Sequence, residues 1–517
     1  AILSILNIFK YLLGDKKVKL IKSISAITFV FAMGLCQAQQ YGSTNFEATG
    51  SAEAHEVFTL GLLEMHNFEY ADALASFLKA QSIDPNFTMA YWGEALAYDQ
   101  FFWHRHQFDK SRAALAKLGA TPEERAARAA TQRERDYLQT IEIRFAEGEH
   151  HERELAYSDA LRDLHEKYPD DLDAAAFYAL SILATSYDGR DFARYMRAGA
   201  ITESILAINP THPGALHYNI HSYDDPIHAP LGLRSASVYS EVAPSAVHAL
   251  HMGSHIYYAL GMWEEGVERN IRSYEEDVSR QADPNDPYGG QAYHALTWVP
   301  YGYQQMGEFA EAREYISRIA KQVKQYGDDA AVHRNHYVTT RASYVVDTQD
   351  WDSELANVEI GHQGLSDYAI TTDLYVKGLV ALNRGDLEDA RSALAMMNMH
   401  GAMDMQGMSN MEGMVMTSAK RADTAPTLLR LALEGQIELA DGNSDRAIEI
   451  IGQAERIEGA LPSEYGPAVP VQPMAELLAD VYHAIGDDEM AKKYYELSLT
   501  RAVGRIRSLS GLNALMD

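Results

Sequence analysis

The chain has 517 residues, of which 47% are hydrophobic and 23% charged, and these ordinary values exclude a wholly disordered or collagen-like chain. The formal net charge of −29, from 44 Lys and Arg against 73 Asp and Glu, argues against a nucleic-acid partner. A single Cys excludes a disulfide framework and thiolate metal sites. The 19 Met and 20 His are unevenly distributed along the chain.

Residues 1–38 are predicted to be an over-extended N-terminus followed by a secretory signal peptide. A lysine-rich segment at 16–22 precedes an apolar stretch at 24–35 and a small-residue ending. This stretch is shorter than the roughly 20 residues of a membrane span, so no integral span is expected in the mature chain. Cleavage is predicted after Ala38, with lipidation of Cys36 as the alternative, and the mature protein is expected to be periplasmic or secreted.

Residues 54–98 show the spacing of a 34-residue tetratricopeptide (TPR) unit. Small residues stand where paired helices must cross closely, and a proline ends the second helix. Five later glycines are each followed five residues on by Ala or Gly, as expected of the turn between paired helices. These pairs are Gly261/Gly266, Gly307/Ala312, Gly385/Ala390, Gly442/Ala447 and Gly486/Ala491. Strand signals are weak. We therefore predict an all-α fold, a TPR-like α-solenoid of stacked antiparallel helix pairs.

Two stretches, 119–152 and 395–426, are predicted to interrupt the array. Residues 50–320 are expected to form an N-terminal TPR-like array, and 321–394 further helical repeats. Residues 395–426 contain several glycines and a proline and are predicted to form a Met-rich loop. Residues 427–517 are expected to form C-terminal repeats. A strongly charged stretch at 119–152 carries both signs interspersed and is predicted to be a long, solvated helix.

Seven of the 20 histidines fall within residues 212–255. His217 and His221 form one i, i+4 pair, and His251 and His255 form another, so each pair lies on one helix face. The repeat phase places the two pairs on the first helices of consecutive units, which lie side by side in a TPR stack. Four imidazoles can therefore converge across one seam between helices.

Converging imidazoles are typical ligands of zinc, copper or iron. His248 extends the second pair by one turn, and His294 on the next first helix can join it. Asp224 ends the helix of the first pair, where it can be an oxygen ligand or accept a hydrogen bond from an imidazole N–H. The alternative interpretation is a buried hydrogen-bonded network that fixes the interface between repeats.

Residues 396–416 contain nine of the 19 methionines. One recurs at every third position, at Met405, Met408, Met411 and Met414. Thioethers are soft ligands that suit Cu(I), and His400 can add a nitrogen. The tract resembles the Met-rich motifs of periplasmic copper-resistance and copper-transfer proteins, which implies Cu(I) binding here and favours copper overall. The alternative is an apolar loop that covers part of a groove or docks to a partner.

A second polar cluster is predicted in the groove, formed by His66, Glu94 and the run of residues 103–106. More often such residues serve repeat packing, with a polar tip that reaches solvent.

Several stretches resemble a family of exported bacterial TPR proteins. They are MAYWGEA at 89–95, LHYNIH at 216–221, YDDP at 223–226, HAP at 228–230, HALHMGSH at 248–255 and LGMW at 260–263. The resemblance spans roughly residues 50–320. It implies the helical-repeat fold and export, and it implies no activity.

The favoured function is an exported solenoid that holds a late transition metal in its histidine cluster and binds a protein partner in its concave groove. One alternative is a metal-dependent hydrolase or oxidase, because three or four imidazoles can leave a coordination position open. Another is a self-assembling, filament-forming solenoid, because head-to-tail contacts that do not close continue indefinitely. This last alternative implies that the protein forms homo-oligomers.

Overall fold

The computed structural model describes residues 40–187, 189–280, 291–327, 331–407, 417–462 and 465–516. It describes only the backbone of residues 291, 292, 326, 401–407 and 417–422. The predicted signal segment at 1–38 lies outside the described residues. Within the described part of the chain, no helix combines the length and the apolar character that a bilayer crossing requires.

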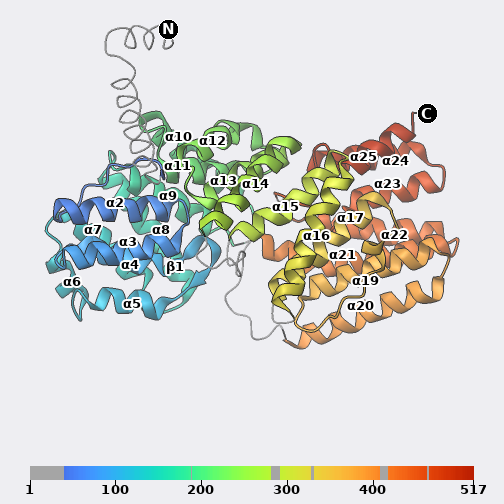
Figure 1. Ribbon diagram of the computed structural model, residues 1–517, viewed down its shortest axis with the longest axis horizontal. Helices are drawn as coiled ribbons and strands as arrows, with labels where there is room; N and C mark the ends of the chain where they lie inside the picture. Colours follow the sequence, from blue (N-terminus) through green and yellow to red (C-terminus); the bar gives the residue numbers. More distant parts are fainter. Residues whose placement is uncertain are drawn as a thin grey trace, which may run out of the picture. The chain divides into compact units, whose positions relative to one another are not determined.

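The N-terminal half is built from helices joined by short turns (Figure 1). Its elements are α2 (Ala52–His66), α3 (Tyr70–Ile83), α4 (Thr88–Ala97), β1 (Asp99–Gln100), η1 (Phe101–Trp103), β2 (Arg105–His106), α5 (Phe108–Ala116), α6 (Pro122–Arg128), α7 (Gln132–Arg144), α8 (His150–Lys167), α9 (Leu172–Ala184), α10 (Phe192–Ile208), α11 (Pro213–Tyr223), α12 (Ala229–Val242), α13 (Val247–Ala259) and α14 (Trp263–Arg280). The two short strands pair antiparallel, Asp99 with His106 and Gln100 with Arg105.

The C-terminal half continues the same pattern. Its helices are α15 (Gln291–Gln305), α16 (Phe309–Tyr326), α17 (Ala331–Thr348), α18 (Glu354–Asn357), α19 (Asp367–Asn383), α20 (Leu387–Gly407), α21 (Thr417–Ala440), α22 (Ser444–Gly459), α23 (Met474–Ala484), α24 (Asp488–Arg501) and α25 (Ile506–Ala514).

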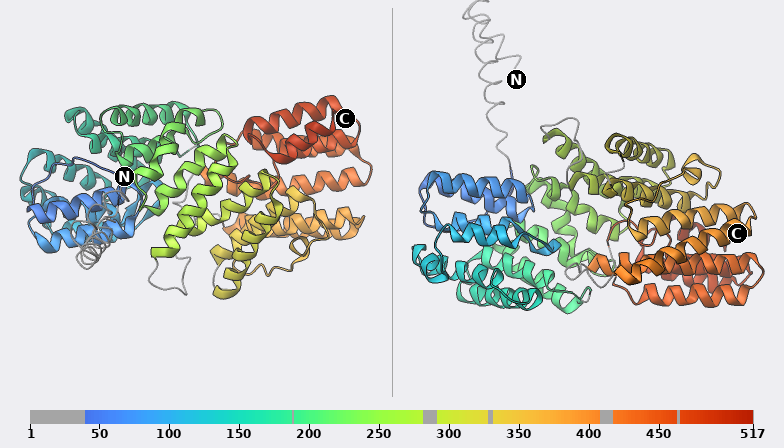
Figure 2. Two further views of the ribbon diagram at one scale, coloured as in Figure 1. Left: turned by 45° about the horizontal axis from the view of Figure 1, so that its top comes forward. Right: turned by 90° about the horizontal axis from the view of Figure 1, so that it is seen from below.

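Consecutive helices pack as pairs, and the first helix of each pair also contacts the first helix of the next. This second set of contacts links α9, α11, α13, α15, α17, α19, α21 and α23 in order. The views in Figure 2 show the same succession of paired helices along the chain. The predicted all-α, TPR-like solenoid is thus confirmed.

The predicted turn glycines lie between the helices of five pairs. Gly261, Gly307, Gly385, Gly442 and Gly486 all have positive φ, a conformation that side chains with a Cβ adopt only with strain. The alanines that follow four of them by five residues are fully buried, because the second helix of each pair crosses the first at that point.

The N-terminal repeats close on themselves. Helix α2 contacts α11, and η1 contacts α9, although these elements are far apart in the sequence. One continuous hydrophobic core therefore includes side chains from 41–259, and every residue of α11 and α13 is buried. Because the protein's own side chains fill this concave side, the groove predicted to receive a partner is not open along these two helices.

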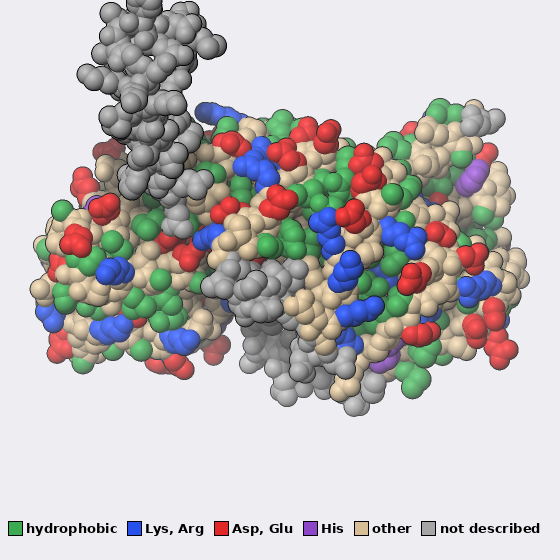
Figure 3. Space-filling view, in the orientation of Figure 1, with side chains coloured by type: hydrophobic (Ala, Val, Ile, Leu, Met, Phe, Trp, Pro, Cys, Tyr) green, Lys and Arg blue, Asp and Glu red, His purple; other side chains and the backbone are tan. Residues whose placement is uncertain are grey.

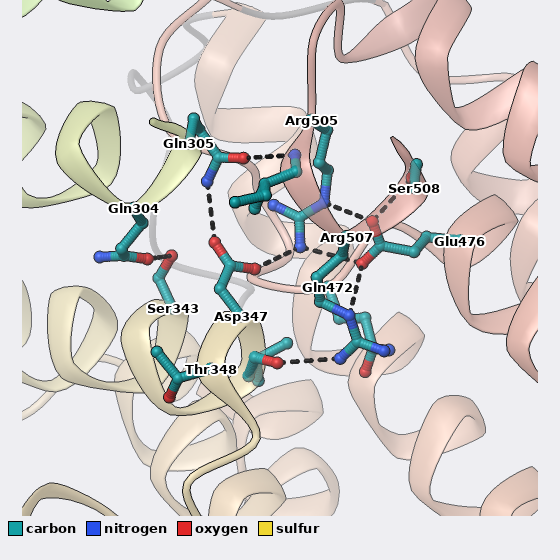
Figure 4. A network of polar contacts seen from close by, with 12 residues as sticks. Gln304, Gln305, Ser343, Asp347, Thr348, Gln472, Glu476, Arg505, Arg507 and Ser508 are labelled. Carbon is teal, nitrogen blue, oxygen red and sulfur yellow. Dashed lines mark hydrogen bonds and ion pairs between the residues drawn. The ribbon is translucent and has the colours of Figure 1, made fainter. Parts of the chain in front are cut away.

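The second large core includes residues from 312–481 and joins all three segments predicted for the C-terminal half. A buried polar network fixes α25 to it (Figure 4). Arg505 binds Glu476 of α23 at 2.7 Å and Asp347 of α17 at 2.6 Å, and all three side chains are fully buried. Gln305 of α15 donates to Asp347 and accepts from the backbone N–H of Ile506.

The charged stretch at 119–152 differs from the prediction of one long, solvated helix. It contains α6 and α7, which begin after Thr121 and Thr131, and each threonine forms a capping box with the glutamate three residues later. Two such start signals divide the segment because each satisfies the free N–H groups of a new helix. Arg144, at the end of α7, is fully buried.

The interval 395–426 is also more helical than predicted. Helix α20 continues to Gly407, and α21 begins at Thr417 and includes Pro426. Alanine and methionine are strong helix formers, which explains why α20 tolerates its glycines. Only residues 408–416 of the predicted loop fall outside the described part of the chain.

The surface carries mixed charge. On the face shown in Figure 3, acidic and basic side chains alternate without a large single-sign patch, and histidine is seldom visible. The concentration of histidine inside the protein is therefore the more informative feature.

A candidate metal centre between neighbouring helices

Six histidines from three consecutive first helices come together. They are His217 and His221 on α11, His248, His251 and His255 on α13, and His294 on α15. The first five are buried and His294 is exposed. The structure thus brings together all six histidines predicted for this cluster.

Local sequence signals fix the position of α11. His212 caps its N-terminus by accepting a hydrogen bond from the N–H of Ala215 at 3.2 Å. Pro213 occupies the first helical turn, and Asp224 is the C-cap residue. Helix α13 begins at Val247, shortly after Pro244.

His217, His221 and His248, named here the first triad, each have a ring nitrogen within 4.8 Å of the other two. The Nδ1 of His217 lies 2.8 Å from the carbonyl oxygen of His66, so this Nδ1–H donates and the Nε2 carries a lone pair. That Nε2 lies 3.1 Å from the Nε2 of His248. The Nε2 of His221 is buried and has no hydrogen-bond partner.

His251, His255 and His294, named the second triad, are grouped in the same way. The Nδ1 of His251 lies 2.5 Å from the Oδ1 of Asn270, whose amide nitrogen donates to a backbone carbonyl. The Nδ1 of His255 lies 3.1 Å from the Oδ2 of Asp224. The Nε2 atoms of His251 and His255 then face each other at 3.1 Å.

The contact between the Nε2 atoms of His251 and His255 determines what the site can bind. Because both Nδ1–H groups of His251 and His255 are used as donors, both facing Nε2 atoms are acceptors. A shared proton would relieve the repulsion, but burial holds the pKa of His251 well below its usual range and lowers that of His255 to about 4. A cation bound by both lone pairs relieves it as well. The separation of 3.1 Å fits two nitrogens that each lie about 2.0–2.1 Å from one ion.

Asp224 connects the two triads. Its Oδ2 accepts from the Nδ1 of His221 at 3.2 Å and from that of His255. Its Oδ1 pairs with Arg190, which also lies 3.3 Å from Asp225. Burial opposes ionisation of Asp224, but Arg190 and the two imidazole donors outweigh it and hold its pKa well below the usual range. Asp224 thus accepts from two rings and orients them, and its carboxylate also groups with His221 and His255, with ligand atoms within 4.8 Å of one another.

Aromatic rings enclose the histidines. Phe68 packs against His217 and His248, with ring centroids 4.3 and 5.5 Å apart. Trp298 and Tyr465 both stack on His255, at 5.1 and 4.1 Å. Sequence reasoning missed Phe68 and Tyr465 because nothing in their spacing links them to the histidines, and chain closure alone brings them there.

The predicted second polar cluster does not form. His66 lies 2.9 Å from Asp173 and 2.9 Å from the hydroxyl of Tyr218, inside the N-terminal core. Glu94 instead binds Lys117 at 2.6 Å. The closure of α2 against α11 separates these residues, which the linear repeat pattern had placed in one groove.

His104 and His106 belong to a third group. They approach Glu154 of α8, and the Nδ1 of His106 lies 2.5 Å from Asp99. Arg144 pairs with both carboxylates, at 2.7 Å to Asp99 and 2.8 Å to Glu154. This guanidinium already compensates the buried negative charge, so the group is best described as an ion-pair network.

The predicted Cu(I) ligands are only partly described. Outside the described residues lie Met408, Met411 and Met414, and the side chain of Met405 on α20 is not described either. His400 lies on α20 with its ring 6.2 Å from that of His362. The structure therefore leaves the methionine site as a prediction.

A cavity of about 110 Å³ lies near the cluster, between α13–α15 and the segment that follows α22. Tyr258, Trp263 and Gly466 line it, but none of the six histidines does. The six-histidine cluster is thus separate from this cavity.

Comparison with known proteins gives information on the fold and none on the site. The tetratricopeptide repeat family model matches residues 474–502, which form α23 and α24. No curated protein matches the chain. Among solved structures, the APC/C hetero-tetramer Cut9–Hcn1 is 14% identical, with 96% of this chain and 82% of that chain covered and a TM-score of 0.33.

Yeast Tom70 is 12% identical, with 90% and 96% covered and a TM-score of 0.36. A human IFIT1 dimer with PPP-AAAA is 13% identical, with 88% and 89% covered and a TM-score of 0.36. Likenesses this distant carry nothing about function. The helix pairs show an all-α, TPR-like solenoid fold, and the tetratricopeptide repeat model matches one of its pairs.

Proposed function

We propose that this protein binds a late transition metal at the six-histidine cluster and uses the solenoid as the rigid frame of that site. The supporting observation is the contact between the Nε2 atoms of His251 and His255, two acceptors held 3.1 Å apart by donors on their far sides. A metal ion is the partner that both lone pairs lack.

The alternative of a purely hydrogen-bonded network explains the cluster less well. Such a network needs a donor for every buried acceptor, because an unpaired buried polar atom costs about 1–3 kcal/mol. The His251–His255 contact has two acceptors and no donor. The Nε2 of His221 is buried without any hydrogen-bond partner.

Copper is the favoured ion in this proposal, with zinc and iron as alternatives. Imidazole nitrogen suits all three, and Cu(II) forms the most stable complexes in the order of divalent first-row metals. The methionine tract supports copper, since thioethers suit Cu(I). The N-terminal pattern of lysines, apolar residues and a small-residue ending supports export, so we place the protein in a periplasm or outside the cell.

The test is metal analysis of the purified protein before and after loading with Cu(II) or Zn(II). We expect metal that survives dialysis in the wild type and is lost in His251→Ala/His255→Ala. His228→Asn is the matched control, because it alters a histidine that lies outside the cluster, beside Asp225, and asparagine is a good N-cap residue for α12. Metal content near zero in the loaded wild type, or unchanged in the double variant, would contradict the proposal.

A metal-dependent enzyme is the second candidate. It is supported by the three imidazoles of each triad, since an ion with three protein ligands keeps a position for water or substrate. Turnover that is abolished together with metal by the same double variant would favour it. We also propose a protein-binding role for the solenoid, on a surface other than the filled concave side of α11 and α13.

A further inference from the structure

We infer that the cluster binds two metal ions, one in each triad, and that this pair of ions takes a small bridging anion. The inference rests on the proposed metal binding. It concerns the number of ions and their arrangement, which the histidine count alone does not determine.

The two triads have no residue in common, and each supplies three ring nitrogens within 4.8 Å of one another. In the second triad the facing Nε2 atoms of His251 and His255 are both acceptors, 3.1 Å apart. In the first triad the Nε2 of His217 carries a lone pair, and the Nε2 of His221 is buried without a hydrogen-bond partner. Two separate groups of ring nitrogens with unused lone pairs indicate two ions.

A single ion between the triads fits less well. The nearest rings of the two triads are those of His221 and His255, whose centroids are 5.5 Å apart. The sides of these rings that meet at Asp224 carry Nδ1–H groups already donated to its Oδ2. An ion placed there would have to replace both hydrogen bonds, whereas the Nε2 positions are free to bind.

Two cations bound in neighbouring triads repel each other, and one residue of the site reduces this repulsion. Asp224 lies between the triads and bonds to one ring of each, so its negative charge acts on both ions. Arg190 offsets part of that charge. An anion bound between the two ions would supply the remaining negative charge. It can occupy the coordination position that three imidazoles leave open on each ion.

The enclosure limits the size of that anion. Phe102 lies 4.5 Å from His221, and Phe68, Trp298 and Tyr465 pack on the remaining buried rings. Because these aromatic rings pack directly on the buried imidazoles, we expect a small anion such as hydroxide or azide.

The first experiment counts zinc in the full chain and in three variants. His217→Ala/His248→Ala removes two ligands of the first triad, His251→Ala/His294→Ala two of the second, and the quadruple variant all four. We expect losses of one, one and two ions per chain relative to the wild type. Counting losses removes any contribution of the groups at His106 and at His66, Asp173 and His212, and His228→Asn is again the control.

The outcomes distinguish the proposed metal binding from the inference of two ions. No loss in the quadruple variant contradicts metal binding at the cluster altogether. A loss of one ion in that variant leaves the proposed function intact and overturns the two-ion inference. A loss of both ions in either double variant, with circular dichroism unchanged, shows one shared site and also overturns it.

A second experiment uses the wild type alone, in case the variants fail to fold. After loading with Cu(II), the copper content is compared with the spin count from electron paramagnetic resonance, before and after addition of azide. Neighbouring bridged ions couple, so we expect fewer spins than copper ions. A spin for every copper ion, unchanged by azide, overturns the inference.

Discussion

Asp224 shows how one buried carboxylate can determine the chemistry of several histidines. By accepting from the Nδ1 atoms of His221 and His255, it leaves the Nε2 of each ring as the free electron pair. Arg190 keeps it ionised. The spacing of the histidines predicted that they converge, but it could not show which nitrogen of each ring faces inward, because this depends on partners distant in the sequence.

Replacement of Asp224 by Asn should therefore weaken metal binding without removing a ligand. Loss of the charge and of one acceptor lets the two rings turn, and substitutions of such ring-orienting partners weaken metal affinity about 10–100-fold. Competition with a chelator of known affinity measures the change. Asp225→Asn is the matched control, because Asp225 pairs with Arg190 and His228 but touches none of the six histidines. Equal affinities in the two variants would contradict the role assigned to Asp224.

Glu64 gives a prediction about pH. It is buried in α2, accepts from the hydroxyl of Ser76 at 2.6 Å, and has its pKa raised to about 7, chiefly by burial. The folded protein thus binds a proton on Glu64 that the unfolded chain releases near its usual pKa. This contribution to stability is present below pH 4.5 and is lost as pH rises through 7.

We expect Glu64→Gln to raise the free energy of unfolding at pH 8, by up to about 3 kcal/mol, and to leave it nearly unchanged at pH 4.5. Urea unfolding at the two pH values measures the difference. Glu56→Gln on the exposed side of the same helix is the control. A Glu64→Gln effect that is equal at both pH values would refute the assignment.

At the scale of elements, the glycine-marked turns were predictable and the ends of several helices were not. Gly261 and Gly486 mark turns from the sequence because a positive φ strongly favours glycine. The extension of α20 to Gly407 was missed because alanine and methionine favour helix despite nearby glycines. The positions of Phe68 and Tyr465 were missed for a different reason, since they depend on contacts between distant helices.

The anchoring of α25 by Arg505 is a prediction at this scale. Arg505→Ala would leave Asp347 and Glu476 buried without their guanidinium partner. Removing one member of a buried ion pair destabilises by about 3–5 kcal/mol. Arg446→Ala, which breaks an exposed pair with Glu449, should change stability by about 1 kcal/mol or less. Chemical unfolding measures both variants, and similar effects would contradict the anchoring role.

For the whole molecule, the repeat periodicity predicted a solenoid with a concave groove, and the structure shows that the N-terminal repeats close on themselves. The contact of α2 with α11 cannot be read from a repeat pattern, because the pattern specifies neighbours and not the curvature that accumulates over many units. The fold class was therefore predictable, and so was the gathering of the histidines. The burial that gives the cluster its chemistry was not.

Metal should accordingly stabilise the array unevenly. A ligand at 100 times its dissociation constant stabilises the state that binds it by about 2.7 kcal/mol. We expect added metal to slow amide hydrogen exchange in α11 and α13, which carry five of the six histidines, and to leave α22 unaffected. The His251→Ala/His255→Ala variant should show no such protection. Uniform slowing over the whole chain would argue against a local site.

The stacking of Tyr465 on His255 also has a consequence for the order in which the protein is made. Synthesis runs from the N-terminus, so all six histidines exist well before this tyrosine does. The unfinished chain can assemble its imidazoles while their C-terminal cover is still missing. Under the proposed metal binding, an ion can therefore reach the unfinished chain before Tyr465 covers His255, so the order of the sequence sets which ligands are accessible during synthesis.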